Sequence, residues 1–420
     1  MREDMSLKKK PVTGMKDILP KEMEIRDYVI GQIKSTYKMF GFQSIETPCV
    51  EHIENLCSKQ GGENEKLIFK ILKRGQKLNL ETAETEADLV DGGLRYDLTV
   101  PLARYYASHV SELPVPFKAL QMGNVWRADR PQRGRYRQFM QCDIDILGEP
   151  SCLAEIELIQ AATTLLGKLD FKDFTIRINN RKILKGMAGY CGFPEKRYDD
   201  VFIILDKMDK IGRDGVEAEL LAEGFDAGAV SRCIALFSGV TGDAESIRAM
   251  RDTLGDYLEE GVAEELENIL LAVDTVKTAD FKMVFDPTLV RGMSYYTGPI
   301  FEIVMDGFGG AVGGGGRYDE MVGRFMGSDT CACGFSIGFE RIVMLLMERE
   351  FQIPKRADKK AFLVDKKASG ELLQEVLERA GQEREKGIQV NVSMMKKNRK
   401  FQKEQLAKEG YTEFREFFNR

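Results

Sequence analysis

Residues 126–148, WRADRPQRGRYRQFMQCDIDILG, decide the fold, because they join two strand-like segments through a densely basic loop. VWR precedes the loop and FMQCDIDIL follows it, which predicts an antiparallel, hairpin-like pair of strands within residues 117–147. Five arginines lie in or beside the loop: Arg127, Arg130, Arg133, Arg135 and Arg137. A guanidinium group is a planar fork that matches phosphate oxygens, so the cluster predicts a polyphosphate site. A basic surface hairpin with no particular ligand is the alternative.

The second strand of this pair carries polar side chains on one face. Gln141, Asp143 and Asp145 alternate with apolar residues, so they point to the same side of a sheet. A pocket floor made of these groups would suit a small cationic or amine-bearing ligand, and Asp97 would join it if its own strand is adjacent. An exposed sheet face is the alternative that the alternation leaves open.

Two further stretches combine glycines with aromatic and basic side chains: LVRGMSYYTG at 289–298 and GGGGRYD at 313–319. Glycine lets a backbone approach a ligand closely, although a turn explains a glycine run more often. The side chains in these stretches that could contact a ligand are Arg291, Tyr295, Tyr296 and Tyr318.

Arg341 begins an apolar helix in the segment GFERI. A guanidinium at a buried edge needs an anion or a carboxylate as its partner. An exposed position in the first helical turn is the alternative.

Charge is distributed unevenly along the 420 residues, whose formal net charge is −6. From Lys355 onward the chain has 17 Lys and Arg against 11 Asp and Glu, so a basic C-terminal segment follows an acidic body. Such asymmetry suits contact with a polyanion at one end, although a solvated surface explains it equally well.

No feature of the sequence predicts a membrane, secreted or zinc protein. No stretch approaches the roughly 18–20 apolar residues of a membrane span, and the charged N-terminus lacks the apolar core of a secretory signal. The eight cysteines show no Cys-x-x-Cys spacing and there are only two histidines, so we expect reduced thiols and no metal site. The cytoplasm is the expected compartment.

The segments around the hairpin predict an α+β fold. A helix is expected at 23–39, where apolar residues recur at helical spacing, followed by strands at 42–50 and 68–72 and an acidic loop at 80–93. Residues 180–280 are acidic with few strand signals, which predicts an inserted helical domain. The last sixty or so residues alternate β, α, β, α, as in an α/β module.

Five motifs resemble those of histidyl-tRNA synthetases, a family of class II aminoacyl-tRNA synthetases. The hairpin segment resembles motif 2, GFSIGFERI resembles motif 3, and IETPCVE resembles motif 1; LVRGMSYYTGPIFE and GGGGRYDEMV resemble the two histidine signatures. The resemblance covers residues 11–350 and implies a class II antiparallel sheet flanked by helices. It divides the chain into a catalytic core at 1–180 and 284–353, a helical insertion at 181–283 and a shortened α/β anticodon-binding-like domain at 358–420.

The resemblance also implies an activity. It implies an ATP-dependent ligase, acting as a homodimer, that activates L-histidine to histidyl-adenylate and transfers it to tRNA(His). ATP with Mg²⁺ is the implied co-substrate, and no prosthetic group is implied.

Site residues follow from the resemblance by position in the motifs. Those assigned to the nucleotide are Arg127 at the α-phosphate, Arg135 and Arg341 at the outer phosphates, Phe139 on the adenine ring and Asp129 near the adenine amino group. Those assigned to histidine are Asp97, Thr99 and Gln141 at the α-amino end, and Asp145, Tyr296 and Tyr318 around the imidazole, with Tyr295 beside them. Arg291 is expected to stabilise the attack of the histidine carboxylate on the α-phosphate.

The chain differs from the family pattern at two points: Ser294 stands where the family usually has Asp, and the C-terminal module is short. A histidine-binding regulatory paralogue, of the kind that partners ATP phosphoribosyltransferase, is the alternative function. The presence of Arg127, Arg291 and Arg341 favours the enzyme over such a paralogue. A synthetase for another amino acid is a third hypothesis, against which the two histidine signatures argue.

Overall fold

The computed structural model describes residues 8–57, 64–290, 295–305, 308, 310–354 and 358–419. It divides into two compact units. The larger unit consists of Met1–Asp17 and Val29–Leu345, and the smaller one of Ile18–Tyr28 and Leu346–Arg420. No helix in the described part of the chain is long and apolar enough to cross a membrane.

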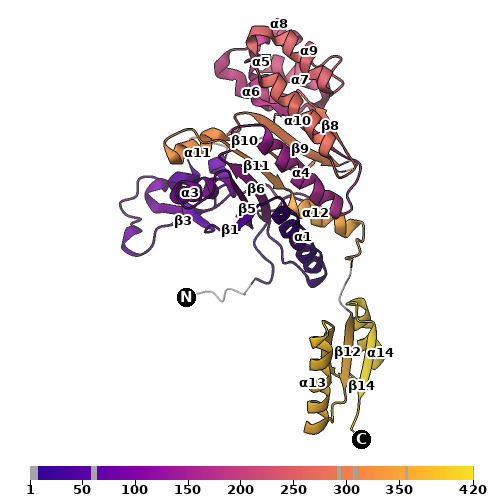
Figure 1. The fold of residues 1–420 in the computed structure, drawn as a ribbon. Helices are drawn as coiled ribbons and strands as arrows, with labels where there is room; N and C mark the ends of the chain where they lie inside the picture. Colours follow the sequence, from indigo (N-terminus) through magenta and orange to yellow (C-terminus); the bar gives the residue numbers. More distant parts are fainter. Residues whose placement is uncertain are drawn as a thin grey trace. The chain divides into compact units, whose positions relative to one another are not determined.

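A large mixed sheet forms the centre of the larger unit (Figure 1). Among the described residues it has eight strands in the order β1-β5-β6-β11-β10-β9-β7-β8. In that order the strands are β1 Gln43–Ile45, β5 Phe117–Trp126, β6 Gln138–Leu147, β11 Ala332–Ile337, β10 Ala311–Arg317, β9 Pro299–Met305, β7 Phe174–Asn180 and β8 Phe281–Phe285. The five inner pairs are antiparallel, while β1 pairs in parallel with β5 and β8 pairs in parallel with β7. The predicted antiparallel sheet is therefore confirmed, with one parallel strand added at each edge.

The predicted hairpin is the longest ladder of this sheet. Strands β5 and β6 pair without interruption from Phe117 opposite Leu147 to Trp126 opposite Gln138. The connecting loop closes on itself, since Gln132 and Arg135 each donate a backbone N–H to the carbonyl of the other, at 3.2 and 2.9 Å.

The glycine run at 313–316 belongs to the central strand β10 and does not form a turn. Its neighbours leave no room for side chains. A Cβ atom at Gly315 would lie 1.9 Å from the backbone oxygen of Gly334, and one at Gly313 would lie 2.6 Å from the ring of Phe335. Close packing of backbone on backbone, and not a reversal of the chain, therefore explains these glycines.

A second, three-stranded sheet has the order β2-β4-β3, with β2 Val50–His52, β4 Val90–Leu94 and β3 Lys70–Leu72. The loop expected at 80–93 is wrong at its end, because β4 begins at Val90. Gly93 permits this strand, since a Cβ there would meet the side chains of Leu56 and Ile68 at 2.8 and 2.9 Å. The single strand expected at 42–50 is split, so that Pro48 lies between β1 and β2.

Helices flank the large sheet. Those that lie beside it are α1 Pro20–Met39, α3 Thr99–His109, α4 Leu153–Lys168, α11 Asp319–Met326 and α12 Phe339–Glu348. Helix α4 packs on β6 and β11 through a buried apolar face that includes Leu158 and Leu165. The helix expected at 23–39 is confirmed and begins one turn earlier.

A buried ion pair joins α4 to the sheet. Arg317, at the end of β10, donates two hydrogen bonds of 2.8 Å to the two carboxylate oxygens of Glu155. Its remaining donors reach the carbonyls of Glu149 at 3.1 Å and Ser151 at 2.9 Å. The side chain of Glu155 is fully enclosed and that of Arg317 is 7% exposed, so this pair is both desolvated and fully hydrogen-bonded.

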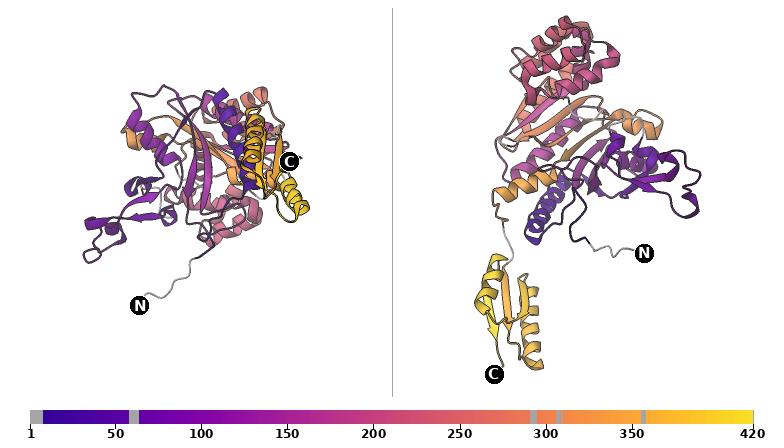
Figure 2. Two further views of the ribbon diagram at one scale, coloured as in Figure 1. Left: turned by 90° about the horizontal axis from the view of Figure 1, so that it is seen from below. Right: turned by 180° about the vertical axis from the view of Figure 1, so that it is seen from behind.

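Six helices follow one another between β7 and β8 and form a bundle at that edge of the sheet (Figure 2). They are α5 Arg181–Cys191, α6 Tyr198–Leu205, α7 Met208–Ala222, α8 Ala227–Leu236, α9 Ala244–Leu254 and α10 Val262–Val276. Three of the six begin with a side-chain N-cap: the side chains of Asn180, Asp226 and Asp243 accept backbone N–H groups of α5, α8 and α9. The helical character expected between 180 and 280 is present, and the domain boundaries remain a prediction.

The smaller unit contains a parallel sheet of order β13-β12-β14, built from β12 Lys359–Val364, β13 Gln389–Met394 and β14 Glu413–Phe417. Helix α13, Gly370–Glu385, packs on one face through Val376 and Ala380, and α14, Arg399–Lys408, packs on the other through Leu406. The predicted β, α, β, α order is confirmed. The third strand, β14, was not predicted, because YTEFREFF mixes charge and aromatic residues without a turn signal before it.

Candidate active site

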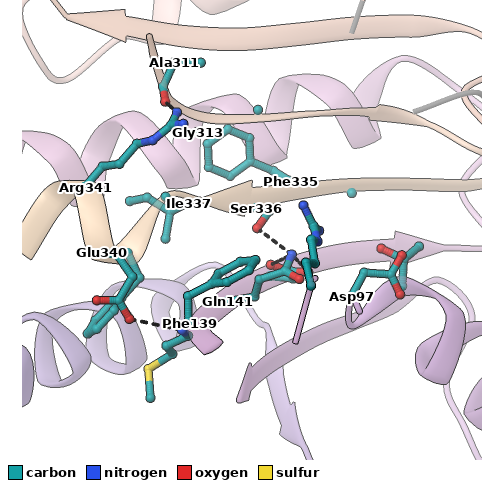
Figure 3. Close-up of a pocket in the computed structure, with 18 of the residues that line it drawn as sticks. Asp97, Phe139, Gln141, Ala311, Gly313, Phe335, Ser336, Ile337, Glu340 and Arg341 are labelled. Atoms are coloured by element: carbon teal, nitrogen blue, oxygen red, sulfur yellow. Dashed lines mark hydrogen bonds between the residues drawn. The ribbon is translucent and has the colours of Figure 1, made fainter. Parts of the chain in front are cut away.

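A pocket opens where β6, β10 and β11 meet the β5–β6 loop and the start of α12 (Figure 3). It is lined by acidic and aromatic side chains at one end and by arginines at the other. The residues from the sequence prediction that line it are Asp97, Thr99, Arg127, Asp129, Arg135, Phe139, Gln141, Asp145, Tyr295, Tyr296, Tyr318 and Arg341. The structure therefore brings together every predicted site residue that it describes. Arg291 and its neighbour Ser294 lie outside the described residues.

Asp145 lies at the acidic end on strand β6. Its Oδ1 accepts a hydrogen bond of 2.6 Å from the hydroxyl of Tyr318. Gly334 stands opposite it in the β6–β11 register, and a Cβ there would come within 2.0 Å of the same oxygen. The carboxylate therefore lies over a backbone position that must be glycine.

Gln141 and Asp143 continue the same face of β6. The side-chain amide nitrogen of Gln141 donates to Asp143 Oδ2 at 3.2 Å and to the hydroxyl of Ser336 at 3.2 Å, the second of which is drawn in Figure 3. The carbonyl oxygen of that amide is buried and has no hydrogen-bond partner in the part of the chain that the structure describes.

Asp97 approaches the pocket from the start of α3. Its Oδ1 accepts the backbone N–H of Val100 at 3.2 Å, which places the carboxylate at a helix N-terminus, where the dipole favours negative charge. Its Oδ2 is buried and, like the Gln141 carbonyl, lacks a partner among the described residues. Two pocket-lining residues thus each have a buried acceptor without a partner in the described part of the chain.

Burial governs the protonation of these carboxyl groups. It raises the pKa of Asp97 to about 6 and the pKa of Asp143 to about 7, and the neighbouring charge of Asp97 contributes to the latter. The pKa of Asp145 is raised well above its ordinary value, again mainly by burial and then by the charge of Asp143. Three desolvated carboxyl groups that repel one another favour a cationic ligand, since a positive charge would allow them to ionise together.

Aromatic rings close this end of the pocket. The rings of Tyr295 and Tyr296 lie 4.8 Å apart in an edge-on arrangement, and Tyr295 lies 6.0 Å from Tyr318. Tyr295 also shares a hydrogen bond with the side chain of Thr99, and burial raises its pKa well above the ordinary value. Burial likewise raises the pKa of Tyr318 well above its ordinary value, so the phenols of Tyr295 and Tyr318 are neutral hydrogen-bonding groups at physiological pH.

Guanidinium groups dominate the other end. Arg127 follows β5, and its Nε donates to the carbonyl of Tyr96 at 2.8 Å while its guanidinium lies 5.2 Å from the ring centre of Phe139. That ring precedes Gln141 by two residues on the same face of β6, so one strand presents both an aromatic surface and the amide. A planar ligand that carries phosphates would meet the ring and the guanidinium together.

Arg341 and Arg135 approach from α12 and from the hairpin loop. Arg341 donates to the carbonyl of Ala311, on strand β10, and its guanidinium lies 5.8 Å from the ring centre of Phe308. The guanidinium nitrogen of Arg135 lies 3.8 Å from Asp129 Oδ2. Arg341 is half-buried, and its side chain lines the pocket wall.

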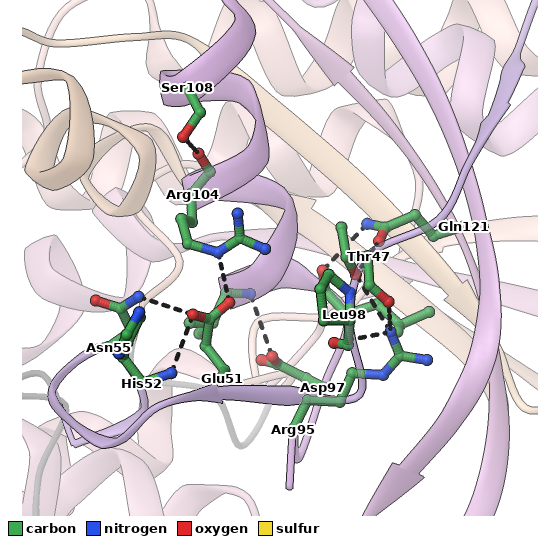
Figure 4. Close-up of polar contacts among 12 residues, drawn as sticks. Thr47, Glu51, His52, Asn55, Arg95, Asp97, Leu98, Arg104, Ser108 and Gln121 are labelled. Carbon is green, nitrogen blue, oxygen red and sulfur yellow. Dashed lines mark hydrogen bonds and ion pairs between the residues drawn. The ribbon is translucent and has the colours of Figure 1, made fainter. Parts of the chain in front are cut away.

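Behind the pocket a polar network joins the segment of motif 1 to the hairpin (Figure 4). Buried Arg95 donates to the carbonyl of Thr47 at 2.7 Å and to that of Asn124 at 3.0 Å. Glu51 accepts from Arg104 at 2.6 Å. These bonds hold the segment between β4 and α3, which carries Asp97, against β5.

The structure also shows lining residues that the sequence did not single out. Glu340 accepts the backbone N–H of Met140 at 3.1 Å, which pins the start of α12 to β6. Ser336 and Gly338 face the cavity from the segment GFSIGFERI. Alternation along that strand could have identified Ser336, whereas Glu340 is recognisable only once α12 and β6 are known to be neighbours.

Comparison with known proteins gives a consistent result. The sequence model of one family, described as histidyl-tRNA synthetase, matches residues 14–342. A histidine–tRNA ligase of Leifsonia xyli subsp. xyli is 48% identical over 345 residues, which cover 80% of each protein. A probable histidine–tRNA ligase of Tropheryma whipplei is 41% identical over 417 residues, covering 96% of this chain and 94% of the relative.

Solved structures agree with the sequence matches. The histidyl-tRNA synthetase of Nostoc sp. PCC 7120 superposes with a TM-score of 0.77 at 29% identity, covering 96% of this chain and 90% of that one. A Bacillus halodurans structure, described as an ATP phosphoribosyltransferase regulatory subunit/histidyl-tRNA synthetase, gives the same TM-score of 0.77 at 21% identity. The second likeness shows the fold alone.

Proposed function

The chain belongs to the histidyl-tRNA synthetase family, and from this premise we propose that it is an ATP-dependent histidine–tRNA ligase that works through the pocket described above. The observation that carries the proposal is the convergence of two kinds of group in one cavity. Buried carboxylates at Asp97 and Asp145 lie at one end, and the guanidinium groups of Arg127 and Arg341 lie at the other. A cationic amino acid and a polyanionic nucleotide would be held side by side.

In the first step, a carboxylate oxygen of histidine attacks the α-phosphorus of ATP, and the bond from that phosphorus to the bridging oxygen of pyrophosphate breaks. The products are histidyl-adenylate and pyrophosphate. The protein supplies no nucleophile, so its contribution is orientation and charge stabilisation. Mg²⁺ enters this proposal with ATP, as part of the co-substrate.

The arginines divide the phosphates among themselves in this proposal. Arg127 contacts the α-phosphate, where charge develops in the transition state, and Arg135 and Arg341 contact the outer phosphates. Adenine stacks on Phe139, with Asp129 near its amino group. Arg291 stabilises the attacking carboxylate; this role rests on its place in the sequence.

Selectivity for histidine comes from the acidic end. Asp145 accepts an N–H of the imidazole with the oxygen that Tyr318 leaves free, and Tyr296 closes the ring pocket. Asp97, Thr99 and Gln141 receive the α-amino group. An amino acid with an apolar side chain would leave a buried carboxylate unpaired, which is the kind of mismatch that binding sites reject most strongly.

In the second step, a terminal ribose hydroxyl of tRNA(His) attacks the acyl carbon of the adenylate, and AMP leaves. The basic C-terminal segment supports contact with the tRNA, because cations at the surface neutralise phosphates. Residues 358–420, which contain the three-stranded sheet of the smaller unit, are the proposed anticodon-binding-like domain. We further propose a homodimer that works in the cytoplasm; the eight cysteines, none of which forms a disulfide in the described part of the chain, suit a reducing compartment.

Histidine-dependent exchange of labelled pyrophosphate into ATP tests the proposal directly. We expect exchange with histidine and none above background with the other nineteen amino acids. A folded preparation that binds histidine but shows no exchange would instead favour the regulatory, histidine-sensing alternative. Light scattering at several protein concentrations tests the dimer, and a monomer at assay concentration would overturn that part.

A further inference from the structure

We propose that Asp143 is a positioning residue for histidine binding: together with Ser336 it fixes the side-chain amide of Gln141 so that the amide carbonyl faces the α-amino group. The proposal rests on the function inferred above and assigns a role to a carboxyl group that does not itself need to touch the substrate. It also explains why a third buried carboxyl group lies between two that are assigned to histidine.

Asp143 occupies a central position in the sheet, between two other polar side chains. It stands directly opposite Ser336 on β11 and opposite Gln121 on β5, so the three polar side chains form a row across three strands. Asp143 is 4% exposed. A buried carboxyl group is costly unless its neighbours hydrogen-bond to it, so its partners indicate what it does.

The glutamine whose side-chain amide hydrogen-bonds to Asp143 is Gln141 and not Gln121. Gln121 is already occupied, since its amide donates to the carbonyl of Leu98 at 3.1 Å and accepts the hydroxyl of Thr47 at 3.1 Å. The amide nitrogen of Gln141 lies 3.2 and 3.4 Å from the two oxygens of Asp143. A carboxylate can only accept hydrogen bonds, so it selects the nitrogen of that amide and turns the oxygen away.

This orientation of the Gln141 amide leaves its carbonyl oxygen without a hydrogen-bond partner in the part of the chain that the structure describes. Gln141 lines the pocket, and with its nitrogen held by Asp143 and Ser336 its carbonyl oxygen is left buried and without a partner among the described residues. Asp97 Oδ2 is open in the same way, and Figure 3 shows the side chains of Gln141 and Asp97 at the same side of the pocket. An ammonium group donates three hydrogen bonds and fits two such acceptors, whereas a flipped amide would present a donor and repel it.

The experiment is a double-mutant cycle on histidine affinity, measured by calorimetry on the full chain. Asp143→Ala and Gln141→Ala should each weaken histidine about tenfold or more, and the double variant should be no weaker than the weaker single variant, because Asp143 acts through Gln141. The KM for ATP in pyrophosphate exchange should stay within about twofold of the wild type, since the nucleotide contacts are elsewhere. Asp143→Asn should recover most of the affinity, because its carbonyl still accepts from Gln141.

Two controls separate positioning from general damage. Imidazolepropionate lacks the α-amino group, so its affinity should be the same for the wild type and for Asp143→Ala. Asp280→Ala removes one exposed negative charge and should leave histidine affinity unchanged. Thermal unfolding of each variant shows that the comparison is made between folded proteins.

Multiplicative losses in the double variant would overturn the inference, because Asp143 would then contact histidine independently of Gln141. An equal loss for imidazolepropionate would also overturn it, since the effect would not depend on the amino group. A wild-type protein that binds no histidine would overturn the proposed function as well, which distinguishes the two failures.

Discussion

Two regions of the larger unit bury charge in opposite ways. The Arg317–Glu155 pair satisfies its hydrogen-bonding groups within the protein. In the pocket floor, by contrast, Asp97 Oδ2 and Gln141 Oε1 are buried without a hydrogen-bond partner among the described residues. Burial also raises the pKa of carboxyl groups there, as it does for Asp97. The first arrangement holds a helix on a sheet. The second keeps carboxyl groups whose pKa values are raised by burial, which suits the cationic ligand that we propose. The difference therefore distinguishes charges that hold the fold together from charges that we assign to binding.

The largest effect should follow from breaking the structural pair. Glu155→Ala removes both hydrogen bonds of the buried Arg317 guanidinium to that carboxylate and leaves Arg317 beside Asp319, whose Oδ1 lies 3.7 Å from its Nη1, and we expect a loss of about 3–5 kcal/mol in the free energy of unfolding. Urea denaturation measures it. The double variant Glu155→Leu/Arg317→Met removes both charges and should restore most of the stability. A loss below about 1 kcal/mol in the single variant would contradict the comparison.

Arg127 should show the reverse pattern, with a loss of activity and little loss of stability. Its guanidinium is held by one backbone carbonyl and faces the cavity, so Arg127→Ala should reduce the exchange rate about 10²- to 10³-fold, as for other groups that meet developing charge. The free energy of unfolding, measured by the same urea denaturation, should change by less than about 1 kcal/mol. Arg130→Ala, an exposed arginine of the same loop, is the matched control and should change neither quantity.

Substitution of Gly334 should reduce both the stability of the protein and its affinity for histidine. A methyl group at this position would collide with Asp145 Oδ1, so Gly334→Ala should displace the carboxylate, weaken histidine about 10- to 100-fold and cost about 1–3 kcal/mol of stability. Calorimetry and denaturation measure the two effects. Gly370→Ala, where an added Cβ meets nothing within 4 Å, is the control. Unchanged histidine affinity in Gly334→Ala would exclude the proposed role of Asp145.

The smallest effect concerns pH. Asp97 has a folded-state pKa near 6, above the roughly 3.9 of an unfolded chain, so its burial costs stability when it is ionised, and this cost declines as the pH falls from about 6 to about 4. Asp97→Asn keeps the acceptor for Val100 and removes the charge. The ligand-free variant should therefore be more stable than the wild type by about 1–2 kcal/mol at pH 8, and the gain should vanish near pH 4. A gain that grows toward acid pH would contradict this assignment.

The sequence predicted the parts of the fold that depend on local pattern. Alternation and a polar loop identified the β5–β6 hairpin, and helical spacing identified α1. Strand β4 and the glycine strand β10 were missed because glycines there serve contacts with residues far along the chain, such as Leu56 and Phe335. Local propensity cannot reveal such contacts.

The candidate site shows the same division. Side chains that we propose to carry the chemistry, such as Arg127 and Asp145, could be named from the motifs, and the structure places them in one pocket. Groups that orient them could not be named: Glu340 binds the backbone of Met140, and Ser336 binds the amide of Gln141. Orientation depends on register between strands, which the sequence does not display.

The parallel pairing of β7 with β8 limits how the connection between these two strands can be changed, by design or by evolution. Parallel neighbours cannot be joined by a tight turn; the chain must travel back along the sheet, which takes about a dozen residues at least. Helices α5–α10 provide this connection, so they cannot be deleted and the end of β7 joined directly to the start of β8. Its length is free to drift, and a single helix of the size of α5 would suffice, but a connection of some kind is obligatory at this edge.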